Sequence, residues 1–556
     1  MAKKLLIVCA LLALISTNLF AQYDMKAPLP MDPNVRIGKL ANGLTYYIRH
    51  NADVISQSII QNVGAILEND DQNGLAHFLE HMAFNGTKHF PGRKGITDML
   101  EKHGVEFGRN VNAYTAQDET VYNISEVPTT NPGLLDTCLL VLHDWSHYLL
   151  LVDEEIDGER GVISEEWRTR RNAGFRVRNQ IMPVLLKDSK YAQRDVIGDL
   201  NIIKNFKYQT LRDYYHKWYR PDLQAIAVVG DFDVDQMEKK VKELFSKIPT
   251  PVNPAKRENF TVNPHDEIYF VCATDKELTQ SSVSVYIKYP APTKEEKNHQ
   301  YMKNGILQSF YNTMLGQRVS ELLQKGNPPF ISAQAGFGGN IVRGWNTYII
   351  STTAKPNEEA GALEAIYREN ERVKKFGFTE GELERAKTNM LVGLESAYKQ
   401  KDKTTSEDYI GEMQSNFLEG EPIVDFDYYY NFAKNIIPTI TVDEVSALAK
   451  QYLNRKNMVI VVQGPSEGVK HITKEEAIAT LDKVENANLE PYKDQSAEAA
   501  LITEDLKGSK IISNKKLPQF DAEEWVLENG AKVVFRKADY EKDQVQVASY
   551  SKGGTS

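Results

Sequence analysis

Two histidines and a glutamate lie within five residues of one another in the segment GLAHFLEHMAFNGT, residues 74–87. Residues four apart on a helix lie one above the other, so His77 and His81 would present both imidazoles on one face, which Glu80 would share. Two imidazoles are half of a catalytic zinc site, and a glutamate beside the open coordination position suits a general base. The alternative is a solvated helix face that carries its histidines by chance.

A third zinc ligand would come from a carboxylate, because catalytic sites with two histidines usually add one. The acidic stretch DEEIDGERGVISEEWRTRR, residues 153–171, offers Glu159, Glu165 and Glu166 on a predicted helix. Glu159 and Glu166 are two helical turns apart and share a face, whereas Glu165 points about 100° away from Glu166. The alternative is an ordinary acidic surface helix.

A second histidine pair occurs in HDWSH, where His143 and His147 are also four residues apart and Asp144 follows the first. This order resembles the H-E-x-x-H motif of one class of zinc proteases, with aspartate in place of glutamate. The flanking segments LLDTCLLVL and YLLLV are strongly apolar, which is typical of a helix in a protein core. We therefore predict that this pair packs in the core and does not bind zinc.

The elements that must position these residues are short alternating strands and long amphipathic helices, which predict an α+β fold of mixed sheets covered by helices. Two segments, WYRPDLQAIAVVGD at 218–231 and QYLNRKNMVIVVQG at 451–464, share an aromatic helix end, a polar turn, a buried strand and a glycine. This repetition predicts two related domains. A second repeat, LANGLTYYIRHN at 40–51 and LENGAKVVFRKA at 527–538, predicts that a third domain has only just begun where the chain stops.

The predicted organisation is a signal peptide at 1–21, a catalytic domain at 22–262, a related non-catalytic domain at 263–480, a linker at 481–522 and the truncated start of a third domain at 523–556. The signal peptide is indicated by Lys3 and Lys4, an apolar run and a small-residue end at Ala21. It predicts export. Because LISTNLFAQ is typical of bacterial signals, we expect the periplasm in preference to the extracellular medium.

The 556 residues carry a formal net charge of −10, with 41% hydrophobic and 26% charged residues. An acidic chain without a block of lysine and arginine is not expected to bind nucleic acid. No segment after the signal approaches ~20 uninterrupted apolar residues, so no membrane span is predicted. The sequence also lacks the histidine-rich tracts of a metal-storage protein.

The order H-x-x-E-H, followed by E-R-x-V-x-x-E-E at 159–166, resembles the inverzincin metallopeptidases of the pitrilysin and insulysin family. Further blocks in the family's order are NAYTAQDETVY, YRPDLQAIAVVGD, LLQKGNPPF and FTEGELERAK, so the likeness covers roughly residues 35–465 and restarts at 523. The resemblance implies four similar α+β domains in two halves, which close like a clam around a peptide. This chain would be the first half.

The resemblance also implies a role for each candidate residue. His77, His81 and Glu166 would hold one Zn²⁺ per chain. Glu80 would be the base that takes a proton from the attacking water. Glu159 would be a second catalytic carboxylate that orients the site without binding the metal.

In the same family the strand that matches NVNAYT pairs with the substrate backbone, which makes Asn112, Ala113 and Tyr114 candidate substrate-binding residues. The implied function is a zinc-dependent endopeptidase that hydrolyses peptides or small unfolded proteins. Its closing partner would be the second half of the full-length protein or a separate subunit. The alternatives are a non-catalytic binding or assembly subunit on the same fold, or a chain that is inactive alone.

Overall fold

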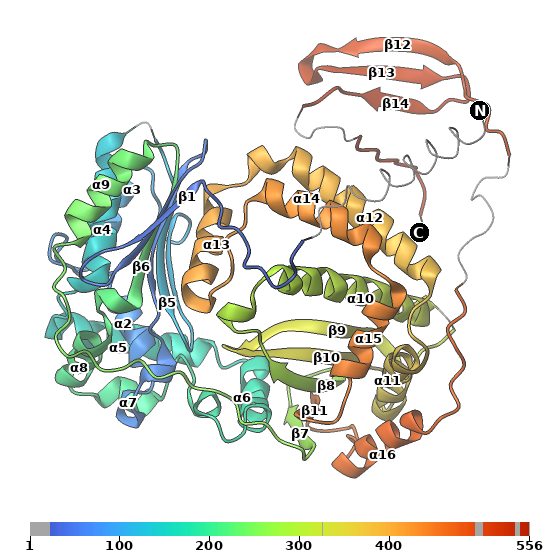
Figure 1. Cartoon of the computed structure of the whole chain (residues 1–556), viewed down its shortest axis with the longest axis horizontal. Coiled ribbons are helices and arrows are strands. Elements are labelled where there is room, and N and C mark those ends of the chain that lie inside the picture. Colours follow the sequence, from blue (N-terminus) through green and yellow to red (C-terminus); the bar gives the residue numbers. More distant parts are fainter. Residues whose placement is uncertain (1–22, 130, 325, 495–503, 540–544, 555–556) are drawn as a thin grey trace, which may run out of the picture. The chain divides into compact units, whose positions relative to one another are not determined.

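The computed structural model describes residues 23–129, 131–324, 326–494, 504–539 and 545–554 (Figure 1). The predicted signal peptide, residues 1–21, lies outside these ranges. The chain divides into two compact units. The first contains the described residues up to Lys387 together with Thr405–Tyr492, and the second contains Thr388–Thr404 and the described residues from Lys493 onward.

The first unit begins with a six-stranded mixed sheet in the order β1-β2-β6-β3-β5-β4. Strands β2 and β6 are parallel, whereas β3 runs antiparallel to both β6 and β5. The edge position at one end belongs to β4, which pairs with β5. The strands are β1 (Val35–Lys39), β2 (Thr45–His50), β3 (Ile55–Gln61), β4 (Val111–Thr115), β5 (Thr120–Val127) and β6 (Gln224–Gly230).

Helices bury both faces of this sheet, and the alternation of strand side chains explains why. Ile59 of β3 lies in the main core with Leu79 of α2 and Leu142 of α4. The next residue, Ile60, faces the opposite side and packs with Ile410 of α13. The helices of this region are α2 (Leu75–Met82), α3 (Gly95–Glu101), α4 (Pro132–His147), α5 (Asp153–Thr169), α6 (Ala173–Leu185), α7 (Leu200–Asn205), α8 (Tyr208–Trp218) and α9 (Val234–Phe245).

A second sheet, in the order β7-β11-β8-β10-β9, repeats the pairing of the first. Its one parallel pair is β7 with β11, as β2 is with β6, and its other neighbours are antiparallel. The two repeated segments of the sequence supply β6 and β11, which hold equivalent places in the two sheets. The prediction of two related α+β folds is confirmed. The strands are β7 (Tyr269–Asp275), β8 (Ser281–Pro290), β9 (Phe330–Val342), β10 (Trp345–Ala354) and β11 (Met458–Pro465).

Several helices around the second sheet begin with a reciprocal cap. The side chain of Thr441 accepts from the N–H of Glu444, whose carboxylate accepts from the N–H of Thr441, and Thr473 with Glu476 repeats this arrangement. Each cap satisfies backbone donors that a helix start leaves free. The helices that follow α9 are α10 (His299–Gln324), α11 (Glu359–Phe376), α12 (Glu380–Lys399), α13 (Ser406–Glu419), α14 (Phe426–Ile436), α15 (Val442–Tyr452) and α16 (Lys474–Glu485). Among them, α13 packs on the first sheet.

The second unit contains a three-stranded antiparallel sheet of β12 (Ile511–Leu517), β13 (Ala522–Leu527) and β14 (Lys532–Phe535). The later Asn-Gly repeat forms the β13–β14 hairpin with Gly530 at φ 84°, as the earlier one forms β1–β2 with Gly43 at φ 100°. The predicted linker at 481–522 includes β12, so part of it is ordered sheet. The bounds of the five predicted segments stay predictions. No helix in the described ranges is long and apolar enough to cross a membrane.

Candidate metal centre

The helix that carries the histidine pair begins at a backbone position only glycine fits well. Gly74 caps α2 at φ 104°, and a Cβ there would lie 3.0 Å from the carbonyl oxygen of Ile197 and from the Cα of Gly198. Both oxygens of buried Glu68 accept backbone N–H bonds at this end, from Gly74 at 3.1 Å and from Ala76 at 2.8 Å. Burial raises the pKa of Glu68 to about 8. The start of α2 is therefore fixed both by its close contact with residues 197–198 and by the hydrogen bonds to Glu68.

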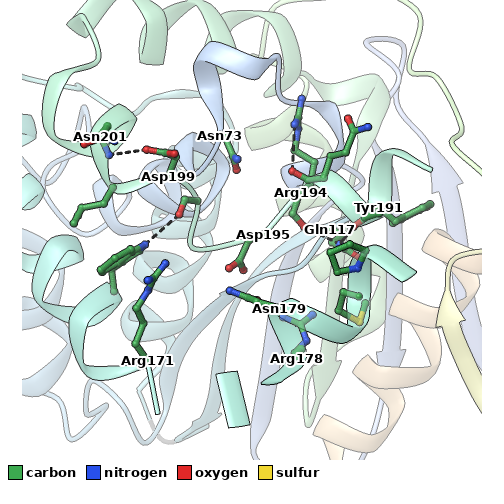
Figure 2. A pocket seen from close by; sticks show the side chains of 17 residues that line it. Asn73, Gln117, Arg171, Arg178, Asn179, Tyr191, Arg194, Asp195, Asp199 and Asn201 are labelled. Carbon is green, nitrogen blue, oxygen red and sulfur yellow. Dashed lines mark hydrogen bonds between the residues drawn. The ribbon is translucent and has the colours of Figure 1, made fainter. Parts of the chain in front are cut away.

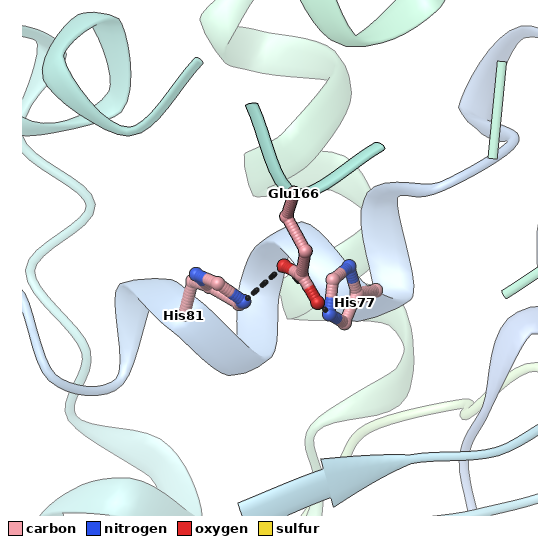
Figure 3. A group of neighbouring side chains, drawn as sticks. All are labelled: His77, His81 and Glu166. Carbon is pink, nitrogen blue, oxygen red and sulfur yellow. Dashed lines mark ion pairs between the residues drawn. The ribbon is translucent and has the colours of Figure 1, made fainter. Parts of the chain in front are cut away.

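Three side chains meet on one face of this helix, where His77 is buried and His81 is partly buried. Glu166 of α5 places Oε2 3.7 Å from Nε2 of His77 and 3.4 Å from Nε2 of His81 (Figure 3). One ligand atom from each of the three residues lies within 4.8 Å of the others. Two imidazoles and one carboxylate are the donor set of many catalytic zinc sites, so these residues fit the ion that the sequence predicts.

The charges of the three groups also suit a cation. Burial, with the neighbouring His81, lowers the pKa of His77 to about 4, which leaves its imidazole neutral. Burial opposes protonation of His81 as well, but its bonds to Glu159 and Glu166 raise its pKa to about 9. The hydrogen bond from His81 lowers the pKa of Glu166. A positive charge between His81 and Glu166 is therefore stabilised, and a metal ion would replace the proton there.

Glu159 holds the ring of His81 from behind. Its Oε1 lies 2.9 Å from Nδ1 of His81, which leaves Nε2 directed at Glu166. Its Oε2 accepts from Nδ2 of Asn85 at 2.7 Å and from Nη2 of Arg93 at 2.9 Å. A carboxylate behind a histidine ring fixes the tautomer and the orientation of a metal ligand.

Glu80 lies on the same helix but outside the three-donor group. It is buried, and burial raises its pKa. The hydroxyl of Thr115, the last residue of β4, donates to Oε2 of Glu80 at 2.7 Å. This hydrogen bond fixes one carboxylate oxygen of Glu80. The other oxygen could accept a proton beside the three candidate ligands.

Glu165 is directed away from this group. Its side chain is 60% exposed and pairs with Arg168 on the next helical turn, at 2.5 Å, whereas the Glu166 side chain is 20% exposed. The two neighbouring glutamates therefore occupy different faces of α5, as helix geometry predicts.

Family models identify the chain. A model of the insulinase family, peptidase family M16, matches residues 47–183, and a model of the M16 inactive domain matches residues 205–390. The chain belongs to the M16 peptidase family. The predicted pitrilysin and insulysin resemblance is confirmed.

Two curated M16 relatives span nearly the whole chain. The probable zinc protease PqqL of Escherichia coli is 29% identical over 98% of the chain and 58% of PqqL, and the zinc protease PQQL-like of Arabidopsis thaliana is 28% identical over 93% of the chain and 51% of that protein. The chain thus spans a little over half of these relatives.

Solved structures of the E. coli periplasmic protease PqqL share the fold. Its first half aligns with a TM-score of 0.76 at 27% identity, over 84% of this chain and 100% of that one. The longer PqqL structure aligns with a TM-score of 0.78 at 26% identity, over 93% of this chain and 57% of that one. The α+β fold predicted from the sequence is therefore that of an M16 protease.

The edge strand β4 of this M16 fold carries the three predicted substrate-binding residues. Asn112 and Ala113 are partly buried and Tyr114 is exposed. The Tyr114 hydroxyl accepts from Nε2 of Gln414 on α13 at 2.6 Å. An edge strand offers free backbone groups to an extended peptide, so a strand added to β4 would lie next to Thr115 and the Glu80 carboxylate that it anchors.

The rival pair in HDWSH does not converge on one point. Nδ1 of His147 lies 3.1 Å from the carbonyl oxygen of Tyr219, whereas buried His143 lies against Asp144. Among the described residues, His143, Asp144 and His89 form a second group whose ligand atoms lie within 4.8 Å. The Asp144 carboxylate also accepts from the Thr87 hydroxyl and from the backbone N–H of His89, both at 2.8 Å. The hydrogen bonds of Asp144 therefore join α4 to the loop that follows α2.

Proposed function

We propose that this chain is the zinc-binding part of a zinc-dependent endopeptidase that hydrolyses peptides or small unfolded proteins. M16 membership and relatives named zinc proteases support a peptidase. The observation that carries the finer proposal is the convergence of two imidazoles and one carboxylate, with a buried glutamate beside them that is not one of the donors. A binding or assembly subunit would not need that fourth group.

His77, His81 and Glu166 would hold one Zn²⁺ per chain. Zinc supplies Lewis-acid polarisation of the scissile carbonyl and makes a water molecule more acidic. Glu80 accepts a proton from the attacking water at the carboxylate oxygen that Thr115 leaves free, and then delivers it to the leaving amine. Glu159 keeps His81 in the tautomer and orientation that the site needs.

The substrate would be an extended peptide added to the edge of β4, held by backbone hydrogen bonds and contacting Asn112, Ala113 and Tyr114. Backbone pairing tolerates many side chains, which suits a peptidase of unfolded segments. The opposite wall would come from a second half, either on a longer polypeptide or on a partner subunit. The E. coli relative PqqL is a periplasmic protease, and export of this chain to the periplasm is part of the proposal.

Cleavage of a quenched, unstructured peptide tests this proposal. We expect hydrolysis that a zinc chelator abolishes and added Zn²⁺ restores, measured for this chain alone and for the chain extended by a second half. Hydrolysis that survives chelation would contradict a zinc mechanism. Peptide binding without cleavage by the zinc-loaded extended protein would favour the binding or assembly subunit instead.

A further inference from the structure

A polar cavity of about 500 Å³ is lined in part by residues that neighbour the candidate metal centre along the chain, and Figure 2 shows its lining side chains. Three of its lining residues are close in sequence to that centre: Asn73 directly precedes the cap of α2, Gln117 lies two residues beyond Thr115, and Trp167 follows Glu166 on α5. The remaining wall comes from α6 and from residues 191–201. A peptide lying on β4 would therefore have this cavity within reach of one of its side chains.

Arginines on the wall of this cavity are available to a ligand. Arg171 stacks on Trp167, with its guanidinium carbon 3.5 Å from the ring centroid, and Arg178 lies on α6. Across the described ranges, neither guanidinium forms an ion pair within 4.0 Å. Arg194 is almost fully buried and pairs with Asp70 at 2.6 Å, but its Nε is buried with no hydrogen-bond partner among the described residues.

Two acidic groups also line the wall. The carboxylate of Asp199 caps α7 and accepts from the N–H of Asn201 at 2.7 Å. Burial raises the pKa of Asp195, whereas the nearby charges of Arg178 and Arg171 act to lower it, so this carboxylate faces the same two arginines. Because neither arginine forms an ion pair within 4.0 Å in the described ranges, both guanidinium groups can still be approached by a carboxylate of a ligand.

Amide groups add directional contacts to this charge. Figure 2 shows Asn73 and Asn179 directed into the cavity near Asp195. The Oδ1 atom of Asn73 is buried without a partner among the described residues, so it can accept an N–H from a bound peptide. Guanidinium groups together with amides are the usual recognition set for a carboxylate.

We propose that this cavity binds an acidic side chain of the peptide substrate, an aspartate or glutamate close to the scissile bond, through Arg178 and Arg171. The inference rests on the proposed peptidase function and adds a side-chain preference to it. Charge-assisted hydrogen bonds are the strong ones, but both arginines are exposed to solvent, which weakens them. We expect a preference of roughly tenfold for a peptide with glutamate over the same peptide with glutamine.

Labelled peptides with blocked ends test the proposal, because the only carboxylate is then that of the side chain. A neutral peptide carries one Glu, Gln or Lys at each position around the cleavage point in turn. Binding is measured by fluorescence anisotropy to zinc-loaded Glu80→Gln protein, with cleavage rates in the unchanged protein as a second readout. We expect glutamate to bind best at one position, and Arg178→Glu to reverse the ranking so that lysine binds best there.

Lys239→Glu is the matched control, since it makes the same charge change on an exposed residue of α9 that does not line the cavity. It should leave the ranking unchanged. Equal binding of Glu, Gln and Lys peptides at every position, or an unchanged ranking in Arg178→Glu protein that retains zinc, overturns the inference. A preference that appears only with a free peptide C-terminus also overturns it, because the carboxylate would then be terminal. Failure of every peptide to bind or be cleaved would instead refute the peptidase function on which the inference rests.

Discussion

Glu80→Gln is expected to keep zinc and peptide binding while losing peptide hydrolysis by a factor of about 10²–10⁴, the usual contribution of a general acid–base group. Glutamine is nearly isosteric, and the three candidate ligands stay in place. The hydroxyl of Thr115 can still bond to the amide oxygen, so the side chain should keep its position. The variant should therefore trap bound peptide without turning it over.

This comparison uses whichever polypeptide cleaves the quenched peptide, either the chain itself or the chain extended by a second half. Zinc content and peptide affinity are measured on the same samples, with Glu101→Gln on the surface of α3 as a matched control. Near-normal turnover in Glu80→Gln protein would mean that another group is the base. Loss of zinc would mean that Glu80 is a ligand.

Glu166→Ala is expected to release zinc and abolish hydrolysis, whereas Glu165→Ala should keep both. The two residues are neighbours of the same type, but only Glu166 reaches both histidines, and Glu165 pairs with Arg168 in solvent. Loss of one of three protein ligands removes a bond to the metal, while loss of an exposed ion pair changes stability by about 0–1 kcal/mol.

Metal titration of the two alanine variants measures the difference in their zinc affinity, because the two proteins differ from the unchanged protein at one neighbouring position each. A weaker zinc affinity in Glu165→Ala than in Glu166→Ala would reverse the assignment. Equal affinity in both variants would mean that the third ligand comes from outside α5.

The features that the sequence predicts well are those governed by local periodicity. His77, Glu80 and His81 share a helix face because of their spacing, and the separation of Glu159 from Glu166 places both on the inner side of α5. The two related sheets are also visible in the sequence, since a repeated strand pattern reports a repeated topology. The caps of α15 and α16 follow from residue types three positions apart.

Contacts between distant segments leave no such pattern. Thr115 reaches Glu80 only through the register of β4, and Gln414 meets Tyr114 across 300 residues of sequence. Nothing in the spacing of Asn85 and Glu159 indicates their hydrogen bond. The cavity likewise collects residues that are far apart in the sequence, from Asn73 to Asn201. These features depend on how helices and sheets pack, which residue spacing along the chain does not encode.

The zinc content of purified protein, compared among three forms, tests the central claim most directly. We expect about one zinc per chain in the unchanged protein and in the His143→Ala/His147→Ala variant, and none in His77→Ala/His81→Ala. An unchanged protein without zinc after gentle purification would contradict the claim. So would zinc that remains after His77 and His81 are replaced but is lost with His143 and His147, because the metal would then lie at the α4 cluster.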